Sequence, residues 1–250
     1  MKRQTFVDYI GVIGIVLCTC FVCAFYSMIM YFVSPHEETF VITNSHDSDV
    51  NDTVVVIDPG HGGEDGGAVG VSGVLEKDIN LAISQYIHDF FVFIDTDCVL
   101  TRKDDILLYE SGQENRKKYH DVRNRVRIAN AYDNPLFVSI HQNKFPMEKY
   151  FGLQVYYSSN NKNSQIIADS IQSNNKMFLQ PDNNRKTKEA VKSIYVLDAL
   201  KCPAVLVECG FLSNSREEGL LSNEDYQKKI AFIIFKSLIE HFATDNTSLA

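Results

Sequence analysis

The sequence predicts an α/β fold in which a mostly parallel central sheet is covered by helices on both faces, preceded by one transmembrane helix. Along residues 53–243, short apolar runs typical of buried strands alternate with amphipathic segments of helical spacing. A length of 250 residues suits one ordinary domain with a substantial core. Residues 9–33 contain no charged side chain, and this run exceeds the roughly 20 residues that span a bilayer as a helix.

The amino-terminal segment, residues 1–33, predicts a cytoplasmic stub and a membrane anchor. Lys2 and Arg3 precede the apolar run while two glutamates follow it, so the positive-inside bias places the rest of the chain outside the cytoplasm. A cleaved signal peptide would have a shorter apolar core and a small-residue cleavage site, so we expect the anchor to be retained. The polar residues 34–52 predict a linker, followed by the domain, 53–243, and a tail, 244–250.

The first half of the domain is expected to run strand, helix, strand, helix. Residues 54–57 form an apolar run that ends in a glycine-rich turn, as a buried strand does. Apolar residues then recur at helical spacing over about 76–91, which predicts an amphipathic helix. A short second strand is expected at 98–101 and a second helix at 122–132.

The second half continues the alternation. We expect strands at 136–140, 152–157 and 204–207, and a helix at 164–173. The last helix is expected to begin near Ser222, because Ser222 and Asp225 have capping-box spacing. Two long polar segments, 103–120 and 180–192, match no regular element, and long loops near a sheet rim often shape substrate access.

Charge and cysteine content argue against a nucleic-acid-binding domain and against a domain held together by disulfides. The net charge is −8, and because residues 1–33 carry a net +1, the remainder carries −8 − 1 = −9; nucleic acid is a poor ligand for so acidic a domain. Cys202 and Cys209 lie too far apart along an extended chain for a disulfide, so with Cys98 they imply no disulfide framework. We expect Cys98 and Cys202 to be buried free thiols.

Four chemically active side chains are predicted to meet at one edge of the sheet. His61, His141 and Glu208 each follow an apolar run, and the carboxyl ends of parallel strands share an edge where such sheets bind ligands. Glu76 opens the helix after the first strand and so reaches the same edge. Two imidazoles and one carboxylate can hold Zn²⁺ with one coordination position open, which leaves a fourth group for proton transfer.

Simpler interpretations exist for each of these residues taken singly. A histidine can pack in a glycine turn, and a glutamate can serve the dipole of a first helical turn. Glu208 is harder to explain this way, because a carboxylate that ends a buried strand is costly unless it is paired or faces solvent. Glu64 and Asp65 lie in the same loop as His61 and are rival ligands. The remaining histidines of the domain are expected to be structural: His88, His120 and His241.

Four motifs in order then establish a resemblance to a known family: DPGHGG at 58–63, GVLEKD at 73–78, SIHQN at 139–143 and VECGFLSN at 207–214. Together they resemble the zinc-dependent N-acetylmuramoyl-L-alanine amidases of the type 3 class, over roughly residues 53–242. The resemblance implies one zinc ion per chain, held by His61, Glu76 and His141 in preference to the rival ligands, with Glu208 as the catalytic carboxylate. It further implies hydrolysis of the amide bond between N-acetylmuramic acid and L-alanine in peptidoglycan.

Among such relatives, a single short domain with one amino-terminal membrane segment looks most like the germination-specific amidases, which act on spore cortex peptidoglycan. The charged stretch 113–120 departs from the family pattern. Arg102, Arg125 and Asn143 are predicted to contact the substrate, and ion pairing within the fold is an equal alternative for the two arginines.

The expected mechanism uses Glu208 as the group that takes a proton from the attacking water and returns it to the departing amine. Two alternatives remain open. One is a cysteine-dependent wall peptidase with Cys209 as nucleophile and His61 or His141 as base. The other is a wall-binding module without activity.

Overall fold

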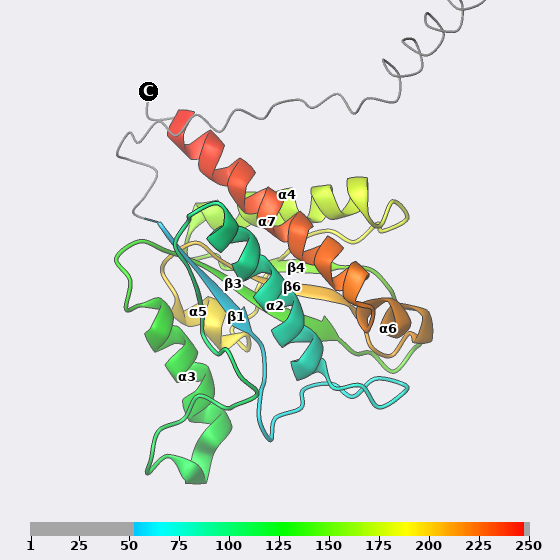
Figure 1. Ribbon diagram of the computed structural model, residues 1–250, viewed down its shortest axis with the longest axis horizontal. Coiled ribbons are helices and arrows are strands. Elements are labelled where there is room, and N and C mark those ends of the chain that lie inside the picture. Colours follow the sequence, from blue (N-terminus) through cyan, green and yellow to red (C-terminus); the bar gives the residue numbers. More distant parts are fainter. Residues whose placement is uncertain (1–52, 248–250) are drawn as a thin grey trace, which may run out of the picture. The chain divides into compact units, whose positions relative to one another are not determined.

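A six-stranded sheet forms the centre of the fold, in the order β2, β1, β3, β6, β4, β5. The computed structural model describes residues 53–247 of the chain, and Figure 1 shows the sheet between two layers of helices. The strands are β1 (Val54–Pro59), β2 (Cys98–Leu100), β3 (Pro135–Asn143), β4 (Gln154–Tyr157), β5 (Lys188–Glu189) and β6 (Ala204–Phe211). All neighbouring strands run parallel except β4 and β6, which run antiparallel, so the prediction of a mostly parallel sheet is confirmed.

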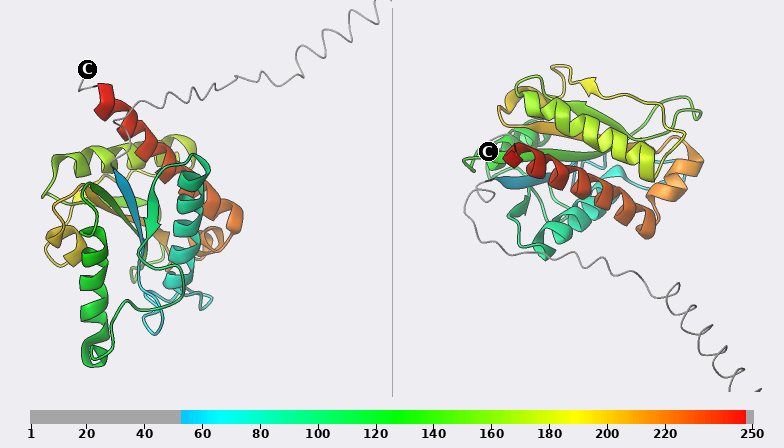
Figure 2. Two further views of the ribbon diagram at one scale, coloured as in Figure 1. Left: turned by 60° about the vertical axis from the view of Figure 1, so that its left-hand side comes forward. Right: turned by 90° about the horizontal axis from the view of Figure 1, so that it is seen from above.

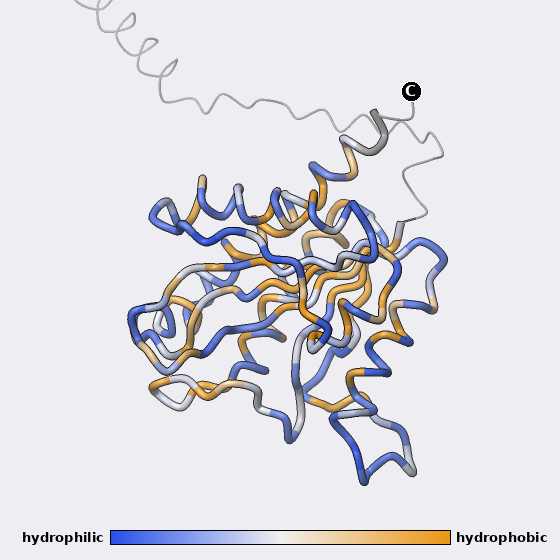
Figure 3. Tube along the Cα trace, turned by 180° about the vertical axis from the view of Figure 1, so that it is seen from behind, coloured by the Kyte–Doolittle hydropathy of each residue, from blue (hydrophilic) through white to orange (hydrophobic). Residues whose placement is uncertain are grey.

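The helices cover both faces of the sheet, as predicted (Figures 1 and 2). On one face lie α2 (Glu76–Phe93), α4 (Lys162–Phe178) and α7 (Glu224–Thr247), and on the other lie α3 (Lys117–Ala129) and α5 (Tyr195–Ala199). Because side chains alternate along a strand, Val55 and Ile57 enter the first layer while Val56 enters the second. Figure 3 shows the apolar strands inside a largely polar outline.

Helix α2 owes its position to a stripe of apolar residues. Ile79, Ile83 and Ile87 recur every fourth residue and are at most 3 % exposed. Each such side chain contributes about 1.5–3 kcal/mol when it leaves water. The stripe fixes the helix against β1 and β3, and the first residue of the helix, Glu76, is thereby held at the rim of the sheet.

Two strands run further than their apolar stretches predicted. His141 and Glu208 lie inside β3 and β6, not beyond their ends, because the ladder between the two strands continues through the pair His141 and Glu208. The register then shifts at a bulge between His141 and Asn143, and beyond it Asn143 pairs with Phe211. Apolar runs mark where a strand is buried, whereas the hydrogen bonds continue into its polar end.

The segment 103–120 is partly helical, contrary to its lack of apolar periodicity. A short 3-10 turn, η1 (Glu114–Arg116), leads directly into α3, which therefore begins five residues before the predicted position at 122. The first turn of α3 is held by polar contacts, since Lys117 and Lys118 pair with Glu64 and Asp65. Charged residues that bond to a neighbouring loop leave no apolar pattern to detect.

The carboxyl-terminal region contains a helix that was not predicted, α6 (Ser215–Leu221). The next helix, α7, begins at Glu224, and the side chain of Asn223 accepts a hydrogen bond from the backbone N of Tyr226 at 3.1 Å. The predicted cap at Ser222 is therefore wrong by one residue. The segment 180–192 contains the two-residue strand β5, and α5 was also not predicted.

The predicted anchor (1–33), the linker (34–52) and residues 248–250 of the predicted tail lie outside the described residues, whereas residues 244–247 of that tail belong to α7. Within residues 53–247, no helix combines the length and the apolar character that crossing a membrane requires. The described residues all belong to one compact unit.

Candidate metal centre

His61 lies in the turn after β1 with a left-handed backbone, φ 61°. The preceding residue, Gly60, packs directly against the ring of His141, and a Cβ at position 60 would lie 2.3 Å from Cε1 and Nε2 of that ring. Only glycine permits so close an approach. The two imidazole rings therefore meet edge to face, with centroids 5.0 Å apart and an interplanar angle of 76°.

Glu76 is buried, 3 % exposed, and its carboxylate is held on all sides. Oε1 lies 2.9 Å from Nδ1 of His141 and accepts a hydrogen bond from the backbone N of Gln142 at 3.0 Å. Oε2 accepts from the backbone N of Ala68 at 2.7 Å and lies 3.3 Å from Nε2 of His61. The carboxylate thus joins the first helix to both histidines.

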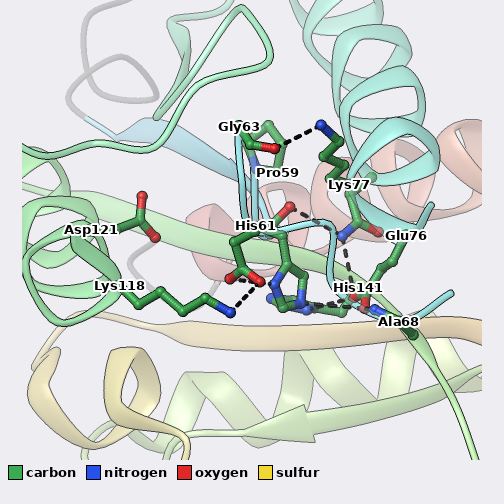
Figure 4. A network of polar contacts seen from close by, with 12 residues as sticks. Pro59, His61, Gly63, Ala68, Glu76, Lys77, Lys118, Asp121 and His141 are labelled. Atoms are coloured by element: carbon green, nitrogen blue, oxygen red, sulfur yellow. Dashed lines mark hydrogen bonds and ion pairs between the residues drawn. The ribbon is translucent and has the colours of Figure 1, made fainter. Parts of the chain in front are cut away.

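His61, Glu76 and His141 together have the composition and spacing of a zinc site (Figure 4). One ligand atom from each lies within 4.8 Å of the others. Ligand atoms about 2.0–2.1 Å from one zinc ion at tetrahedral angles lie roughly 3.3 Å apart. Nε2 of His61 lies 3.3 Å from Oε2 of Glu76 and Nδ1 of His141 lies 2.9 Å from Oε1, so each imidazole approaches a different oxygen of the carboxylate at about that separation. Three protein ligands leave one coordination position for a water or substrate.

Asp65 lies behind the ring of His61, at 2.9 Å from Nδ1, and Lys118 donates to its other oxygen at 2.7 Å. A carboxylate in this position orients a metal-binding imidazole and leaves the opposite nitrogen, here Nε2, free to act as a ligand. Glu64, the other rival ligand, points to Lys117 instead and is largely exposed. The geometry therefore brings His61, Glu76 and His141 together and leaves Glu64 and Asp65 out.

The electrostatics of the cluster favour a positive charge at its centre. Burial by itself lowers the pKa of His61, but the hydrogen bonds and charges of Glu76 and Asp65 outweigh it and raise that pKa to about 9. Burial by itself raises the pKa of Glu76, but contact with His141 and His61 brings it well below its ordinary range. A divalent cation would offset the same negative charge of the carboxylates that otherwise keeps a proton on the imidazole of His61.

Glu208 lies beside the cluster. It is the register partner of His141 across β3 and β6, so the two side chains lie on the same face of the sheet. Burial raises the pKa of Glu208 to about 7, while His141 opposes this shift and Glu76 adds to it. Its Oε2 is buried and has no hydrogen-bond partner among the described residues. A carboxyl group in this state can accept or donate a proton near neutral pH.

The arginines predicted to contact the substrate are buried instead. Arg102 and Arg125 are each 2 % exposed. Arg102 donates to the backbone carbonyls of Pro59 and Gly60, and Arg125 donates to those of Pro59 and His61. This geometry favours the alternative, a structural role, in which both arginines hold the turn that carries His61. Asn143, the third predicted residue, is partly buried at the bulge of β3.

Asp58 is a residue that supports the site and that sequence reasoning missed. It is 1 % exposed, forms an ion pair with Arg125 at 2.6 Å, and accepts hydrogen bonds from the hydroxyls of Thr101 and Ser139. Asp121 provides a second carboxylate for Arg125 at 2.8 Å. Burial opposes ionisation of Asp58, but Arg125 and the two hydroxyls lower its pKa below the ordinary value. An aspartate directly after a buried apolar run was the available signal.

The cysteines do not support a thiol mechanism. Cys209 is fully buried, and burial raises the pKa of its thiol far above the ordinary value, so a nucleophilic thiolate is disfavoured. Cys98 and Cys202 are free as predicted, and both are partly buried. His88, His120 and His241 do not join the cluster of metal-ligating side chains found within the described residues.

Comparison with known proteins identifies relatives over the same region. Residues 55–240 match the family model described as N-acetylmuramoyl-L-alanine amidase. The germination-specific N-acetylmuramoyl-L-alanine amidase of Bacillus subtilis is 35 % identical over 191 residues, which cover 76 % of this chain and 79 % of that protein. The N-acetylmuramoyl-L-alanine amidase AmiA of Escherichia coli is 29 % identical over 231 residues, which cover 76 % of each protein.

A solved structure shows the same arrangement of the chain. The CwlD amidase from Clostridioides difficile, in complex with the GerS lipoprotein, is 36 % identical with a TM-score of 0.74, and the match covers 78 % of this chain and 100 % of that one. The amidase AmiC2 of Nostoc punctiforme is 30 % identical with a TM-score of 0.66, covering 76 % and 97 % of the two chains.

Proposed function

This chain belongs to the family of N-acetylmuramoyl-L-alanine amidases, and from that membership we propose a zinc-dependent enzyme that trims spore cortex peptidoglycan for germination. The family activity is hydrolysis of the amide bond between N-acetylmuramic acid and L-alanine. The observation that carries the zinc dependence is the convergence of His61, Glu76 and His141 on one point. A zinc ion bound there would supply a Lewis acid that polarises a carbonyl oxygen and acidifies a water.

Glu208 is the proton-transfer group in this proposal. Its unpartnered oxygen lies beside the three proposed ligands, and its pKa of about 7 suits a group that must first accept and then release a proton. It takes a proton from the attacking water as the carbonyl carbon is attacked. It returns that proton to the nitrogen of the alanine, which must be protonated before it can depart as an amine.

The remaining residues of the site hold these groups in place. Asp65 fixes which nitrogen of His61 faces the centre, and the backbone N of Gln142 and of Ala68 hold Glu76 in its orientation. Arg125, which Asp58 holds by an ion pair, donates to the backbone carbonyl of His61 and so holds the turn that carries this histidine. A rigid site of this kind keeps the reacting groups aligned without a reorganisation cost during the reaction.

The role in the spore cortex is supported by the similarity to the germination-specific amidase of Bacillus subtilis. We propose that the chain is anchored by residues 9–33 with its enzymatic domain outside the cytoplasm, where peptidoglycan lies. The related CwlD amidase is seen in complex with a lipoprotein. A membrane-associated protein partner of that kind is therefore part of the proposal.

Digestion of cortex and vegetative peptidoglycan in parallel tests the function. The zinc-loaded chain is expected to release peptides with a free alanine amine, leaving N-acetylmuramic acid with a free lactyl carboxylate, in higher yield from cortex. A chelator should stop the reaction, added zinc should restore it, and a thiol-alkylating reagent should leave it unchanged. Mass analysis that finds the peptides still attached to the sugar would contradict the proposal.

A further inference from the structure

Arg185 lies in the segment 180–192, which matched no regular element, and it contacts β4 and β6. Three contacts fix its guanidinium group. Nε donates to the backbone carbonyl of Phe151 at 2.7 Å, Nη1 donates to Oε1 of Gln154 at 3.2 Å, and the guanidinium carbon lies 4.4 Å from the centre of the Phe211 ring. An arginine held over an aromatic ring has a defined orientation and keeps its charge.

These contacts place Arg185 close to Glu208. Gln154 is the register partner of Glu208 across β4 and β6, so its side chain, which Arg185 contacts, lies on the same face of the sheet. Two residues further along β4, burial raises the pKa of Tyr156, the charge of Glu208 raises it further, and the charge of Arg185 opposes both. The charges of Glu208 and Arg185 therefore both influence the hydroxyl of Tyr156.

The guanidinium group of Arg185 has N–H donors available to bind a ligand. A guanidinium group carries five N–H donors, and the two bonds above use two of them, so 5 − 2 = 3 have no partner among the described residues. Arg102 and Arg125 differ, because they are buried under several carbonyl and carboxylate contacts. Within residues 53–244, no carboxylate is in ion-pair contact with Arg185, although burial raises the pKa of Glu217 and the charge of Arg185 acts to lower it.

The surroundings of Arg185 are open enough to admit a ligand. It lines a hollow of about 250 Å³ together with a second cation, Lys149, and the ring of Tyr150. One carboxylate, that of Asp182, also lines the hollow. In a chain of net charge −8, two cations that line one hollow can attract an anionic group.

We propose that Arg185 is a specificity-determining residue that binds a carboxylate on the peptide side of the scissile amide. This inference rests on the proposed function. Hydrolysis leaves the sugar on one side and the peptide amine on the other, and the peptides of bacterial walls carry carboxylates beyond the first alanine. The planar guanidinium matches a carboxylate in a two-point contact, which a lysine cannot reproduce.

Two muropeptides that differ only at the residue after alanine test the inference. One has a free carboxylate there and the other has the corresponding carboxamide. The zinc-loaded full chain is expected to cleave the first with a kcat/KM roughly tenfold higher, as for a hydrogen bond between two charged groups. Arg185→Gln should bring this ratio close to one, and Arg185→Lys should retain part of it. Lys192→Gln, which removes an exposed charge from the same segment, should leave the ratio unchanged.

The outcomes separate this inference from the function on which it rests. Equal cleavage of the two muropeptides by the parent chain, or a ratio that survives in Arg185→Gln, would overturn the role of Arg185 while leaving the amidase intact. No cleavage of either muropeptide by the zinc-loaded parent would overturn the proposed function together with the inference. If Arg185→Gln does not fold, Arg185→Lys takes its place as the test, and a ratio equal to the parental one in that variant would overturn the role of Arg185.

Discussion

His141 and Glu208 face each other as register partners on two adjacent parallel strands, β3 and β6. The pairing sets a proposed metal ligand and the proposed proton carrier on the same face of the sheet, so their relative position depends on the backbone ladder and not on a loop. Glu76 reaches His141 from the start of α2 at 2.9 Å. The division of roles between these residues leads to the first prediction.

Glu208→Gln is expected to retain zinc and lose hydrolysis. Glutamine keeps the shape of the side chain but cannot accept a proton, so kcat/KM should fall by about 10²–10⁴-fold. His141→Ala should instead lose the metal itself, because two ligands remain. Zinc content and muropeptide turnover distinguish the two variants, and the exposed Glu189→Gln is the matched control. Parental turnover by Glu208→Gln would remove Glu208 from the mechanism.

Asp65→Asn is expected to weaken zinc binding by about 10–100-fold, which is the usual effect of removing a carboxylate behind a metal-binding histidine. The uncharged amide oxygen holds the proton on Nδ1 of His61 less strongly than the carboxylate does, so Nε2 is less available as a ligand. Glu64→Gln, one residue away and exposed, should bind zinc as the parent does. A competition titration against a chromophoric chelator measures both. Equal affinities in the two variants would contradict the role assigned to Asp65.

The sheet edge that carries the site could be predicted from the sequence because it depends on local patterns. Apolar runs located β1, β3 and β6, and parallel strands bring their carboxyl ends together. The helical stripe of α2 placed Glu76 at the same edge. These signals do not depend on contacts between distant residues.

The features that could not be predicted from the sequence depend on contacts between residues far apart in the chain. The antiparallel direction of β4 and the bulge after His141 follow from pairing with β6, which no single segment encodes. The burial of Arg125 depends on Asp58, 67 residues away in the chain. The position of Arg185 beside Gln154 likewise depends on a loop with no periodic pattern.

The buried pair of Asp58 and Arg125 predicts a loss of stability in acid. The pKa of Asp58 is lowered in the folded protein, so its contribution is complete above its unfolded pKa of about 3.8 and is lost as the pH falls through the lower folded value. Asp58→Asn should lower the free energy of unfolding at pH 7 by about 3–5 kcal/mol, because it breaks a buried ion pair. The difference between parent and variant should narrow below pH 4.

Denaturant unfolding at pH 7 and pH 3 measures this effect. The exposed Asp133→Asn should change the free energy of unfolding little at either pH, since surface substitutions usually do. If the free energies of unfolding of Asp58→Asn and the parent differ by the same amount at pH 7 and at pH 3, the stabilisation does not come from the ionised carboxylate.

The hairpin of residues 68–76 leads into Glu76 and is held at both its base and its tip. Its base is closed by the hydrogen bond from the backbone N of Glu76 to the carbonyl of Ala68. Its tip is held by Glu218 of α6, whose carboxylate accepts from the backbone N of Ser72 at 2.8 Å and from the Ser72 hydroxyl at 3.0 Å. Glu218 is only 5 % exposed, so these contacts are shielded from solvent. The position of Glu76 thus depends on a residue more than 140 positions away in the chain.

Glu218→Gln is expected to loosen the hairpin, because an amide offers one acceptor oxygen where the carboxylate offers two. Amide hydrogen exchange in residues 69–75 should become faster, and zinc should bind several-fold more weakly since Glu76 is less well held. Ser72→Ala removes only the hydroxyl contact, about 1 kcal/mol, and should show a smaller change in the same direction. The exposed Glu224→Gln is the control for the loss of charge. Parental exchange rates in Glu218→Gln would show that the hairpin holds its shape without α6, and Glu76 would then be positioned by α2 and its contacts with Gln142 and Ala68 alone.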